Sequence, residues 1–481
     1  MINLLSDIFN AMLPELFILM TILIVIMLSM FYNVRFHKIS KWVTLFGVIC
    51  AMFSLQKLQL EPIYYAFNDN ILSDTFTVFI KALILISAFI IILLSKRNVT
   101  KRNHKTFQFY ALLLSGILAS MLVASANDFL ILTVSLELLS FITYFLIAYK
   151  KGYASKEASL KYIVTNAFST AVFLFGVSYL YGITGSLNFN DINSYFLEHE
   201  PTIIYTFSII FIVSGLLFKL AILPFANWVM DVYEGAPTSV TAFIATIPKI
   251  AMIAVLARLL AFSLSYSFEL PFVLIILSIL TAIWANITAI RQKNILRLLG
   301  CSSSANASYM MFALCLVSVY NLSTVLFYLV TYIFMNLGVF AAIITLENSS
   351  YSSKLYEFKG FAYSNPLFTL AFAICIFGLA GFPITSGFIA KLYLFSAIIK
   401  SGAIFIPFLL ILMITIVVAA YYYTNIVKFM FEKNENVDNE SLPNTFTAST
   451  MILYTCTVIT ILVGICPSML IELCKFIAYN L

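Results

Sequence analysis

Six charged residues inside long apolar stretches of the sequence stand out, and their side chains are the ones that could do chemistry. They are Glu137, Lys81, Lys161, Lys219, Lys249 and Lys391. A charged side chain at mid-bilayer costs roughly 2.5–3.5 kcal/mol even on a lenient insertion scale, so five uncompensated lysines would rival the whole stability of a domain. We therefore expect these side chains to face protein or water. Amines and carboxylates in such places bind and release protons, so proton movement is the expected chemistry.

The depth of each side chain separates the stronger candidates from the weaker ones. Lys249 lies close to the middle of its apolar stretch. Because a helix rises about 1.5 Å per residue, this position is also close to the middle of the membrane. Glu137 is the only carboxylate deep in such a stretch. Lys81 and Lys161 lie within about two turns of an end, where a long lysine side chain can also reach the membrane surface. Both interpretations stay open for these two lysines, and Lys81 is given no role.

The composition assigns the chain to the membrane proteins. Of its 481 residues, 62% are hydrophobic and 10% are charged, and a membrane-spanning helix needs about 20 apolar residues. Apolar stretches of that length predict fourteen spans, at 13–32, 39–58, 75–95, 106–125, 128–149, 160–182, 202–223, 237–262, 271–290, 294–319, 321–347, 365–400, 404–430 and 446–478. No connection is long enough to fold by itself. We expect one all-α polytopic membrane domain over residues 1–481.

The distribution of basic residues predicts an orientation. Of the 27 lysines and arginines, eighteen fall in alternate connections or at the span ends beside them, four in or beside the remaining connections, and five further inside spans. Basic residues concentrate in cytoplasmic loops, so this alternation supports the number of spans and predicts that both termini are periplasmic. The N-terminus lacks the basic start and cleavage site of a signal peptide. The first span is therefore expected to be retained.

Two apolar stretches are too long for one straight span and contain a proline. Pro224 interrupts residues 202–233, with Lys219 five positions before it, and Pro383 interrupts residues 365–400, with Lys391 eight positions after it. A broken helix inside a membrane is tolerated only where protein or a water-filled cavity satisfies the freed backbone groups. Broken spans in corresponding positions indicate internal repeats. We expect two inverted five-helix repeats, at 106–262 and 271–430, followed by a last helix at 446–478, although a chance placement of two prolines stays open.

An acidic pair follows the first break. Asp231 and Glu234 are three residues apart and can share a helix face, and Pro237 suits the first turn of the next helix. Carboxylates near a helix start are stabilised by its dipole. A capping role and a functional role toward Lys249, twelve residues further on, both stay open.

Several kinds of cofactor site lack support. The seven cysteines form no C-x-x-C pair and are interpreted as small core hydrophobes. The three histidines lie in connections, so no pair of intramembrane imidazoles can hold a haem. No glycine-rich nucleotide motif is present. We expect no cofactor or metal, and no redox chemistry, on this chain.

Several motifs carry a resemblance to a known family. They are Leu-Pro-Glu at 13–15, Ser-Leu-Glu-Leu-Leu-Ser at 135–140, Glu-Ala-Ser-Leu-Lys-Tyr at 157–162, Phe-Lys-Leu at 218–220, Asp-Val-Tyr-Glu-Gly-Ala-Pro-Thr at 231–238, Pro-Lys-Ile at 248–250, Gly-Phe-Pro-Ile-Thr-Ser-Gly-Phe-Ile-Ala-Lys at 381–391 and the tyrosine triplet 421–423. With them the chain resembles the antiporter-like membrane subunits of NADH-quinone oxidoreductase (respiratory complex I), and most closely the subunit N group. The similarity runs from about Leu13 to Pro467.

The resemblance implies a proton-translocating subunit of fourteen helices, driven by quinone reduction elsewhere in the complex. In this comparison Glu137 resembles the acidic partner of Lys219, Lys249 the next relay lysine, Lys391 the terminal lysine, and Lys161 an auxiliary relay residue. The other membrane subunits of complex I are the implied partners, and NAD, FMN, iron–sulfur clusters and quinone are expected on partner subunits. The chain would be part of an enzyme without performing redox chemistry itself.

The chain departs from the family pattern at three positions. Leu296 stands where the family usually has a lysine, and Asn306 and Ala226 stand where it usually has histidines. Water wires or Lys293 could bridge the resulting gap between Lys249 and Lys391. The alternatives are a divergent, non-pumping scaffold subunit and a subunit of a multi-subunit cation/proton antiporter, which shares this fold.

Overall fold

The structure is a computed structural model that describes residues 11–30, 34–58, 63–95, 106–150, 152–263, 270–316, 318–349, 351–432 and 447–480. In these ranges the chain is almost entirely helical, with one two-stranded sheet. Within the same ranges, 12 helices are long and apolar enough to cross a membrane. The predicted all-α polytopic membrane fold is confirmed.

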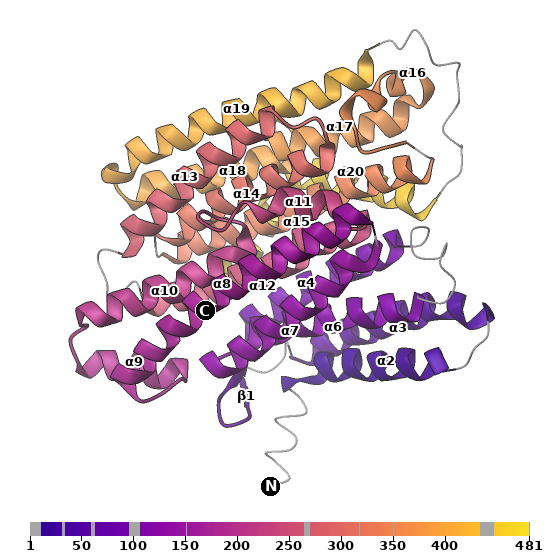
Figure 1. Cartoon of the computed structure of the whole chain (residues 1–481). Helices are drawn as coiled ribbons and strands as arrows, with labels where there is room; N and C mark the ends of the chain where they lie inside the picture. Colours follow the sequence, from indigo (N-terminus) through magenta and orange to yellow (C-terminus); the bar gives the residue numbers. More distant parts are fainter. Residues whose placement is uncertain are drawn as a thin grey trace. The chain divides into compact units, whose positions relative to one another are not determined.

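The chain divides into two compact units, and the first comprises residues 1–220, 235–273 and 477–481. Its elements are α2 (Leu13–Met30), α3 (Val34–Leu58), β1 (Tyr64–Ala66), β2 (Ile71–Ser73), α4 (Thr75–Leu94), α6 (Thr106–Ser125), α7 (Phe129–Ile147), the 3₁₀ turn Ala148–Lys150, α8 (Tyr153–Thr184), α9 (Phe189–Glu198), α10 (Ile203–Leu220) and α12 (Thr238–Ser263). The apolar stretch of α12 is buried throughout, and α12 packs against α4, α6, α7 and α10. Helices α8 and α10 lie side by side (Figure 1).

A short hairpin ties together one end of the first unit. Strands β1 and β2 pair antiparallel, with Tyr64 opposite Ser73, and the turn between them has positive φ at Phe67, Asn68 and Asp69. Asn127, just before α7, donates its backbone N–H to the Asn70 carbonyl at 2.9 Å. The hairpin therefore fixes the segment that leads into α7, whose middle carries Glu137.

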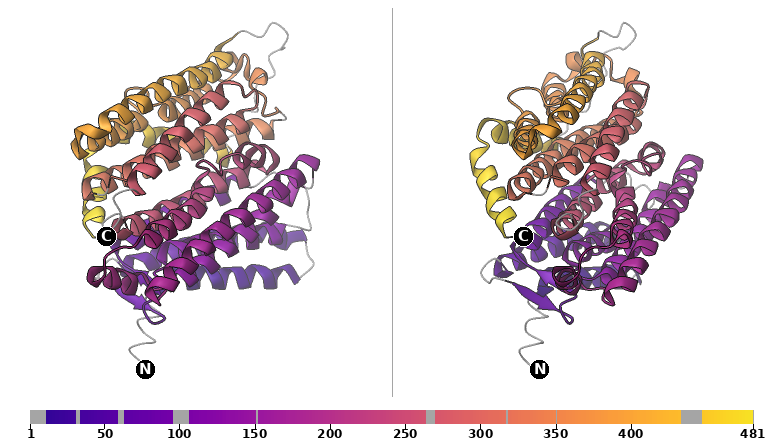
Figure 2. Two further views of the ribbon diagram at one scale, coloured as in Figure 1. Left: turned by 60° about the vertical axis from the view of Figure 1, so that its left-hand side comes forward. Right: turned by 90° about the vertical axis from the view of Figure 1, so that its left-hand side faces the viewer.

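The second unit comprises residues 221–234 and 274–476. It holds all or most of α11 (Trp228–Gly235), α13 (Leu270–Ile290), α14 (Ile295–Leu314), α15 (Val319–Asn348), the 3₁₀ turn Leu355–Phe358, α16 (Phe361–Ser364), α17 (Pro366–Ala380), α18 (Ser386–Ser401), the 3₁₀ turn Ala403–Phe405, α19 (Ile406–Phe431), α20 (Ala448–Ile465) and α21 (Ser468–Tyr479). Helix α15 packs against α14, α17, α18 and α20. Helices α17 and α19 of this unit, drawn in shades of orange, pack against each other (Figure 2).

Three of the fourteen expected spans take a different form. The stretch 365–400 is divided into α17 and α18, as the break at Pro383 predicts. The stretch 446–478 is divided into α20 and α21, because Pro467 has no N–H to continue the helical ladder. The stretch 294–319 forms α14, which is less apolar than the 12 candidate spans because it carries four serines and an asparagine. The inverted symmetry of the repeats 106–262 and 271–430 stays a prediction.

Candidate functional site

Lys219 lies near the end of α10, the first half of the first broken helix. It is the penultimate residue of α10, and Pro224 lies in the turn that separates α10 from α11. Its side chain is only 6% exposed. The ammonium donates to the Ser140 hydroxyl of α7 at 2.6 Å and to the Tyr162 hydroxyl of α8 at 3.2 Å. The break thus places a buried ammonium against hydroxyl groups of two neighbouring helices.

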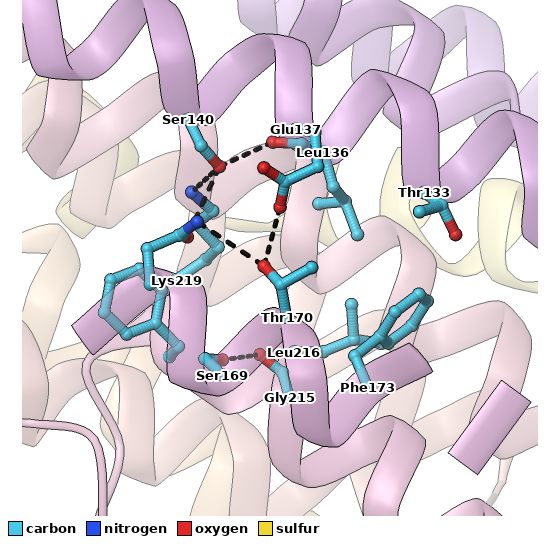
Figure 3. Close-up of a pocket in the computed structure, with 12 residues that line it drawn as sticks. Thr133, Leu136, Glu137, Ser140, Ser169, Thr170, Phe173, Gly215, Leu216 and Lys219 are labelled. Carbon is cyan, nitrogen blue, oxygen red and sulfur yellow. Dashed lines mark hydrogen bonds between the residues drawn. The ribbon is translucent and has the colours of Figure 1, made fainter. Parts of the chain in front are cut away.

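A continuous chain of polar side chains joins Lys219 to Glu137 (Figure 3). After the ammonium, the Ser140 hydroxyl donates to the Asn166 side-chain oxygen at 3.3 Å. The Asn166 amide donates to the Thr170 hydroxyl at 3.4 Å, and that hydroxyl donates to Glu137 Oε1 at 2.6 Å. The Ser140 hydroxyl also lies 2.7 Å from the Leu136 carbonyl and has a single proton, so it can donate to only one of its two acceptors at a time.

The same polar side chains line a cavity. Glu137, Ser140, Asn166, Thr170 and Lys219 all face it, and its volume of about 20 Å³ is enough for one water molecule. A water there would find several polar partners, which a buried water requires. Among the described residues, Glu137 and Lys219 are therefore linked through neutral groups rather than as a direct ion pair, which differs from the pairing that the resemblance implied.

Lys249 and Lys161 have opposite environments in the first unit. Lys249 lies near the middle of α12 and is 1% exposed, directly after Pro248. Its helix packs against α10, which carries Lys219. The Lys161 side chain is 46% exposed and forms an ion pair with Glu157 at 2.8 Å on the outer side of α8. The hydrogen-bond chain from Lys219 to Glu137 runs without Lys161.

Lys391 folds back across the second broken helix. Its ammonium donates to the carbonyls of Leu379 at 3.0 Å and Ala380 at 2.7 Å, the last two residues of α17. These carbonyls have no partner within their own helix because α17 ends there. Gly381 makes the approach possible, since its φ is 85° and an added Cβ would lie 2.8 Å from the Lys391 Cδ. The lysine beside this break is therefore also its cap.

The acidic pair is held by an arginine. Asp231 and Glu234 share a face of α11, as expected, and the Nη1 group of Arg297 donates to both carboxylates at 2.8 Å. The Asn294 amide donates to Glu234 at 3.0 Å. Pro237 lies one residue before the first turn of α12, where its carbonyl accepts from the Thr241 N–H at 2.9 Å, rather than within that turn as expected. The sequence did not reveal Arg297 as the partner, because only folding places the start of α14 beside α11.

A hydroxyl and amide network fills the core of the second unit around Asn306. The Tyr328 hydroxyl donates to the Asn306 side-chain oxygen at 2.7 Å, and the Asn306 amide donates to the Ser302 carbonyl at 2.8 Å. The Ser302 hydroxyl in turn bonds the hydroxyl of Tyr423. Asn306 is 4% exposed. The position where the family usually has a histidine therefore holds a neutral member of a buried network.

A second part of this network reaches Lys391. The Tyr422 hydroxyl donates to the Asn286 side-chain oxygen at 3.1 Å, and the Asn286 amide donates to the Tyr309 hydroxyl at 3.1 Å. The ammonium of Lys391 lies 6.0 Å from the centre of the Tyr309 ring. The rings of Tyr422 and Tyr423 are 4.5 Å apart, so the two parts of the network adjoin. Polar groups thus extend from Lys391 through the core of this unit.

Replacing Asn306 with leucine tests the network by its stability. The Tyr328 hydroxyl would lose its acceptor in a buried place, which typically costs about 1–3 kcal/mol. We expect Asn306→Leu to lower the unfolding temperature of the purified protein, measured by the fraction left soluble after stepwise heating. The double variant Asn306→Leu with Tyr328→Phe removes both partners and should recover most of the loss. An unchanged unfolding temperature for the single variant would show that the network contributes little.

The other two departures from the family pattern are buried apolar positions. Leu296 is 3% exposed in the first turn of α14, and Ala226 is fully buried. Lys293, which could have bridged the gap, is exposed just before α14. The buried network around Asn306 therefore supplies neutral hydroxyl and amide groups in the second unit, where the family usually has titratable ones.

The described residues contain no group of three or more histidine, cysteine, aspartate or glutamate side chains that could hold a metal ion. Five of the seven cysteines are buried, and Cys50 and Cys466 are partly exposed or exposed. The expectation that this chain carries no cofactor of its own stays an expectation.

Sequence comparison identifies the family. Residues 126–419 match the family described as NADH:quinone oxidoreductase/Mrp antiporter, transmembrane. The NAD(P)H-quinone oxidoreductase subunit 2 of Thermosynechococcus vestitus is 32% identical over 437 residues, which cover 90% of this chain and 84% of that protein. The chain belongs to this family. A relative of the same name from Prochlorococcus marinus is also 32% identical and covers 96% of the chain and 93% of its own length.

Solved structures agree with the family assignment. A chain of respiratory complex I from Thermus thermophilus, solved with bound Aureothin, superposes with a TM-score of 0.81 at 29% identity, covering 95% of this chain and 98% of its own. Chains of an archaeal membrane-bound sulfane sulfur reductase (TM-score 0.90, 23% identity, 98% and 97% covered) and of the Mrp complex from Dietzia (TM-score 0.84, 18% identity, 98% and 97% covered) share the fold. The expected resemblance to antiporter-like membrane subunits of complex I is confirmed.

Two stripes of polar residues mark the parts of the site that the sequence interpretation missed. Tyr162, Asn166 and Thr170 recur every four residues on α8, and Ser302 and Asn306 do the same on α14. Residues at this spacing share one face of a helix. A search for hydroxyl and amide side chains at helical spacing inside apolar spans would have found both stripes.

Proposed function

We propose that this chain is the proton-translocating subunit, of the subunit N type, of an NADH-quinone oxidoreductase in a bacterial inner membrane. The observation that carries the proposal is the polar chain from Lys219 through Ser140, Asn166 and Thr170 to Glu137. A buried ammonium and a carboxylate that share a water-sized cavity can exchange a proton through hydroxyls and water. The relatives named NAD(P)H-quinone oxidoreductase subunit 2 supply the kind of complex in which this exchange would be used.

The exchange depends on the charge state of Glu137. While the carboxylate is ionised it stabilises the ammonium of Lys219, by an interaction worth on the order of a few kcal/mol in a poorly solvated setting. When the carboxylate is protonated or turns away, Lys219 loses this stabilisation and can release its proton to a hydroxyl or to water. Restoring the interaction draws a proton back onto Lys219. The alternative acceptors of the Ser140 hydroxyl give the chain two arrangements between which it can switch.

The other candidate residues take further roles in this proposal. Lys249 is a second relay lysine and Lys391 the terminal one, while the half-exposed Lys161 is at most an auxiliary proton donor. In the second unit the tyrosine, serine and asparagine network takes the place of the missing titratable residues. The prolines Pro224, Pro237 and Pro383 hold the helix breaks and starts, and Asp231 and Glu234 with their arginine form a coupling element.

The chain performs no redox chemistry in this proposal. NAD, FMN, iron–sulfur clusters and quinone would be held by partner subunits, and the other membrane subunits of the complex would be its direct neighbours. Both termini would be periplasmic.

Replacing Glu137 with alanine tests the function. We expect Glu137→Ala to lower quinone-linked proton pumping per electron in the assembled complex reconstituted into vesicles. The variant removes the carboxylate that accepts from Thr170 and that exchanges a proton with Lys219 in this proposal. Glu198→Ala, at the exposed end of α9, is the matched control and should pump normally. Unchanged pumping with normal assembly in Glu137→Ala would contradict the proposal and favour a scaffold subunit. Sodium/proton exchange without NADH oxidation would instead favour the cation/proton antiporter.

A further inference from the structure

A second ion pair is buried in the first unit. Glu15 lies in the first turn of α2, and Lys81 lies in α4. Lys81 Nζ is 2.7 Å from Glu15 Oε1, and the side chains are 0% and 3% exposed. A buried pair of this kind must overcome the loss of hydration of both charges, so its retention calls for an explanation.

The pair is incompletely satisfied by hydrogen bonds. Among the described residues, Glu15 Oε2 has no hydrogen-bond partner, and the contact of Lys81 Nζ lacks hydrogen-bond geometry. The Ser125 hydroxyl at the end of α6 reaches Glu15 Oε1 only at 3.5 Å. Buried polar atoms in proteins are nearly always hydrogen-bonded. A purely structural ion pair would be expected to have its remaining lone pairs filled, whereas this carboxylate keeps one oxygen available.

Among the residues whose side chains the structure describes, the helices around α4 supply few other charges. α2 contributes Glu15, and α6 contributes no charged residue. From α3, Lys41 donates to the Leu93 carbonyl near the far end of α4. From α12, Arg258 binds Asp74 at 2.7 Å, at the start of α4, and Lys249 lies deeper in the same helix. Glu15 is thus the carboxylate that faces Lys81.

The position of the pair relates it to the relay lysine of α12. Asp74 caps the start of α4 and binds Arg258, which lies five residues before the end of α12, and the two helices pack along each other. At about 1.5 Å per residue, Lys81 lies roughly 10 Å and Lys249 roughly 13 Å from that contact. Both lysines therefore lie at nearly the same level of the unit. The end of the unit that holds the Asp74–Arg258 contact also carries a polar cavity of about 270 Å³, lined by Asp69, Asp128 and other residues. Asp128 follows Ser125, the neighbour of Glu15, by three positions.

We propose that Glu15 and Lys81 form a second proton-binding pair, in which Oε2 of Glu15 takes up and releases one proton. Uptake converts the carboxylate to a carboxylic acid while Lys81 keeps its three protons, so the charge of the pair changes from zero to plus one. Release returns the same proton and restores the ion pair. The change of charge would act on Lys249 at the same level of the unit. The inference rests on the proposed function, because it needs proton transport through this chain.

The test compares single and double replacements in the assembled complex in vesicles. Glu15→Gln and Lys81→Met each leave one member of the pair without its partner, whereas the double variant leaves no buried charge. We expect the double variant to assemble like the wild type and yet to pump fewer protons per electron, with the same loss as Glu15→Gln. A double variant that assembles and pumps normally would overturn the inference, because a structural pair predicts full recovery.

Two further measurements keep the inference separable from the proposed function. Infrared difference spectra between the resting and the turning-over complex should contain a carboxylic acid band that Glu15→Gln removes, and absence of such a band would count against the pair. The control Asp74→Asn with Arg258→Met replaces the ion pair at the end of the same two helices and should leave the pumping ratio unchanged. If Lys219→Met lowers the ratio while the Glu15 and Lys81 double variant does not, the inference fails and the proposed function stands.

Discussion

Replacing Lys219 with methionine is expected to abolish the proton transport that this subunit carries. A positioned proton-transfer group contributes typically about 10²–10⁴-fold to the rate of its step, and Lys219 is the ammonium at one end of the chain to Glu137. Methionine has a similar length and no charge, so a site that is 6% exposed should accept it. Ser140 keeps the Leu136 carbonyl as an acceptor in the variant. We therefore expect near-normal assembly, with fewer protons pumped per electron.

The measurement is the number of protons translocated per NADH oxidised by the reconstituted complex. Lys161→Met should cause a smaller loss than Lys219→Met, because Lys161 is half exposed and pairs with Glu157. Lys156→Met, on the exposed start of α8, is the control that should change nothing. Full pumping in an assembled Lys219→Met complex would exclude the relay role of this lysine.

Replacing Lys391 with methionine is expected to cause a comparable loss of pumping together with a loss of stability. The ammonium donates to two carbonyls at the end of α17, and hydrogen bonds to charged groups are worth about 1.5–3 kcal/mol each. Methionine cannot donate, so the last turn of α17 would lose its cap. The proton-carrying group beside Tyr309 would be lost at the same time.

A comparison variant separates these two effects of Lys391. Gly381→Ala strains the same break, because Gly381 has φ 85° and its added Cβ would crowd Lys391, but it keeps the amine. After correction for the amount of assembled complex, Lys391→Met should pump less than Gly381→Ala. Equal pumping by the two variants at equal assembly would assign Lys391 a structural role only.

The sequence predicted the charged members of the site well, because a charge in an apolar span is conspicuous. Lys219 and Lys249 are buried as expected, and the breaks at Pro224 and Pro383 fall where the long apolar stretches contain proline. The neutral members were missed, since serine, threonine and asparagine occur in many membrane helices without a role. Asn166 and Thr170 gain significance only when α8 lies against α7 and α10.

Lys81 shows the limit of judging depth from position along a helix. Its place within two turns of an end made reaching the membrane surface as reasonable as burial, yet its side chain is fully buried against Glu15. The outcome depends on the start of α2, which packs against α3 and α6, bringing Glu15 to Lys81, and no local pattern encodes that contact. The partnership of Arg297 with Asp231 and Glu234 likewise depends on α14 starting beside α11.

The amino-acid sequence by itself determined the membrane class, the helical fold, the breaks and the charged residues inside the spans. These follow from hydropathy, from proline chemistry and from the cost of burying charge, which act locally along the chain. Tertiary structure alone decided which partners those charges have. It joined Lys219 to Glu137 through neutral side chains, gave Lys391 the free carbonyls of α17, and paired Lys81 with Glu15. Contacts between distant segments depend on how whole helices pack, and that packing is a property of the entire unit.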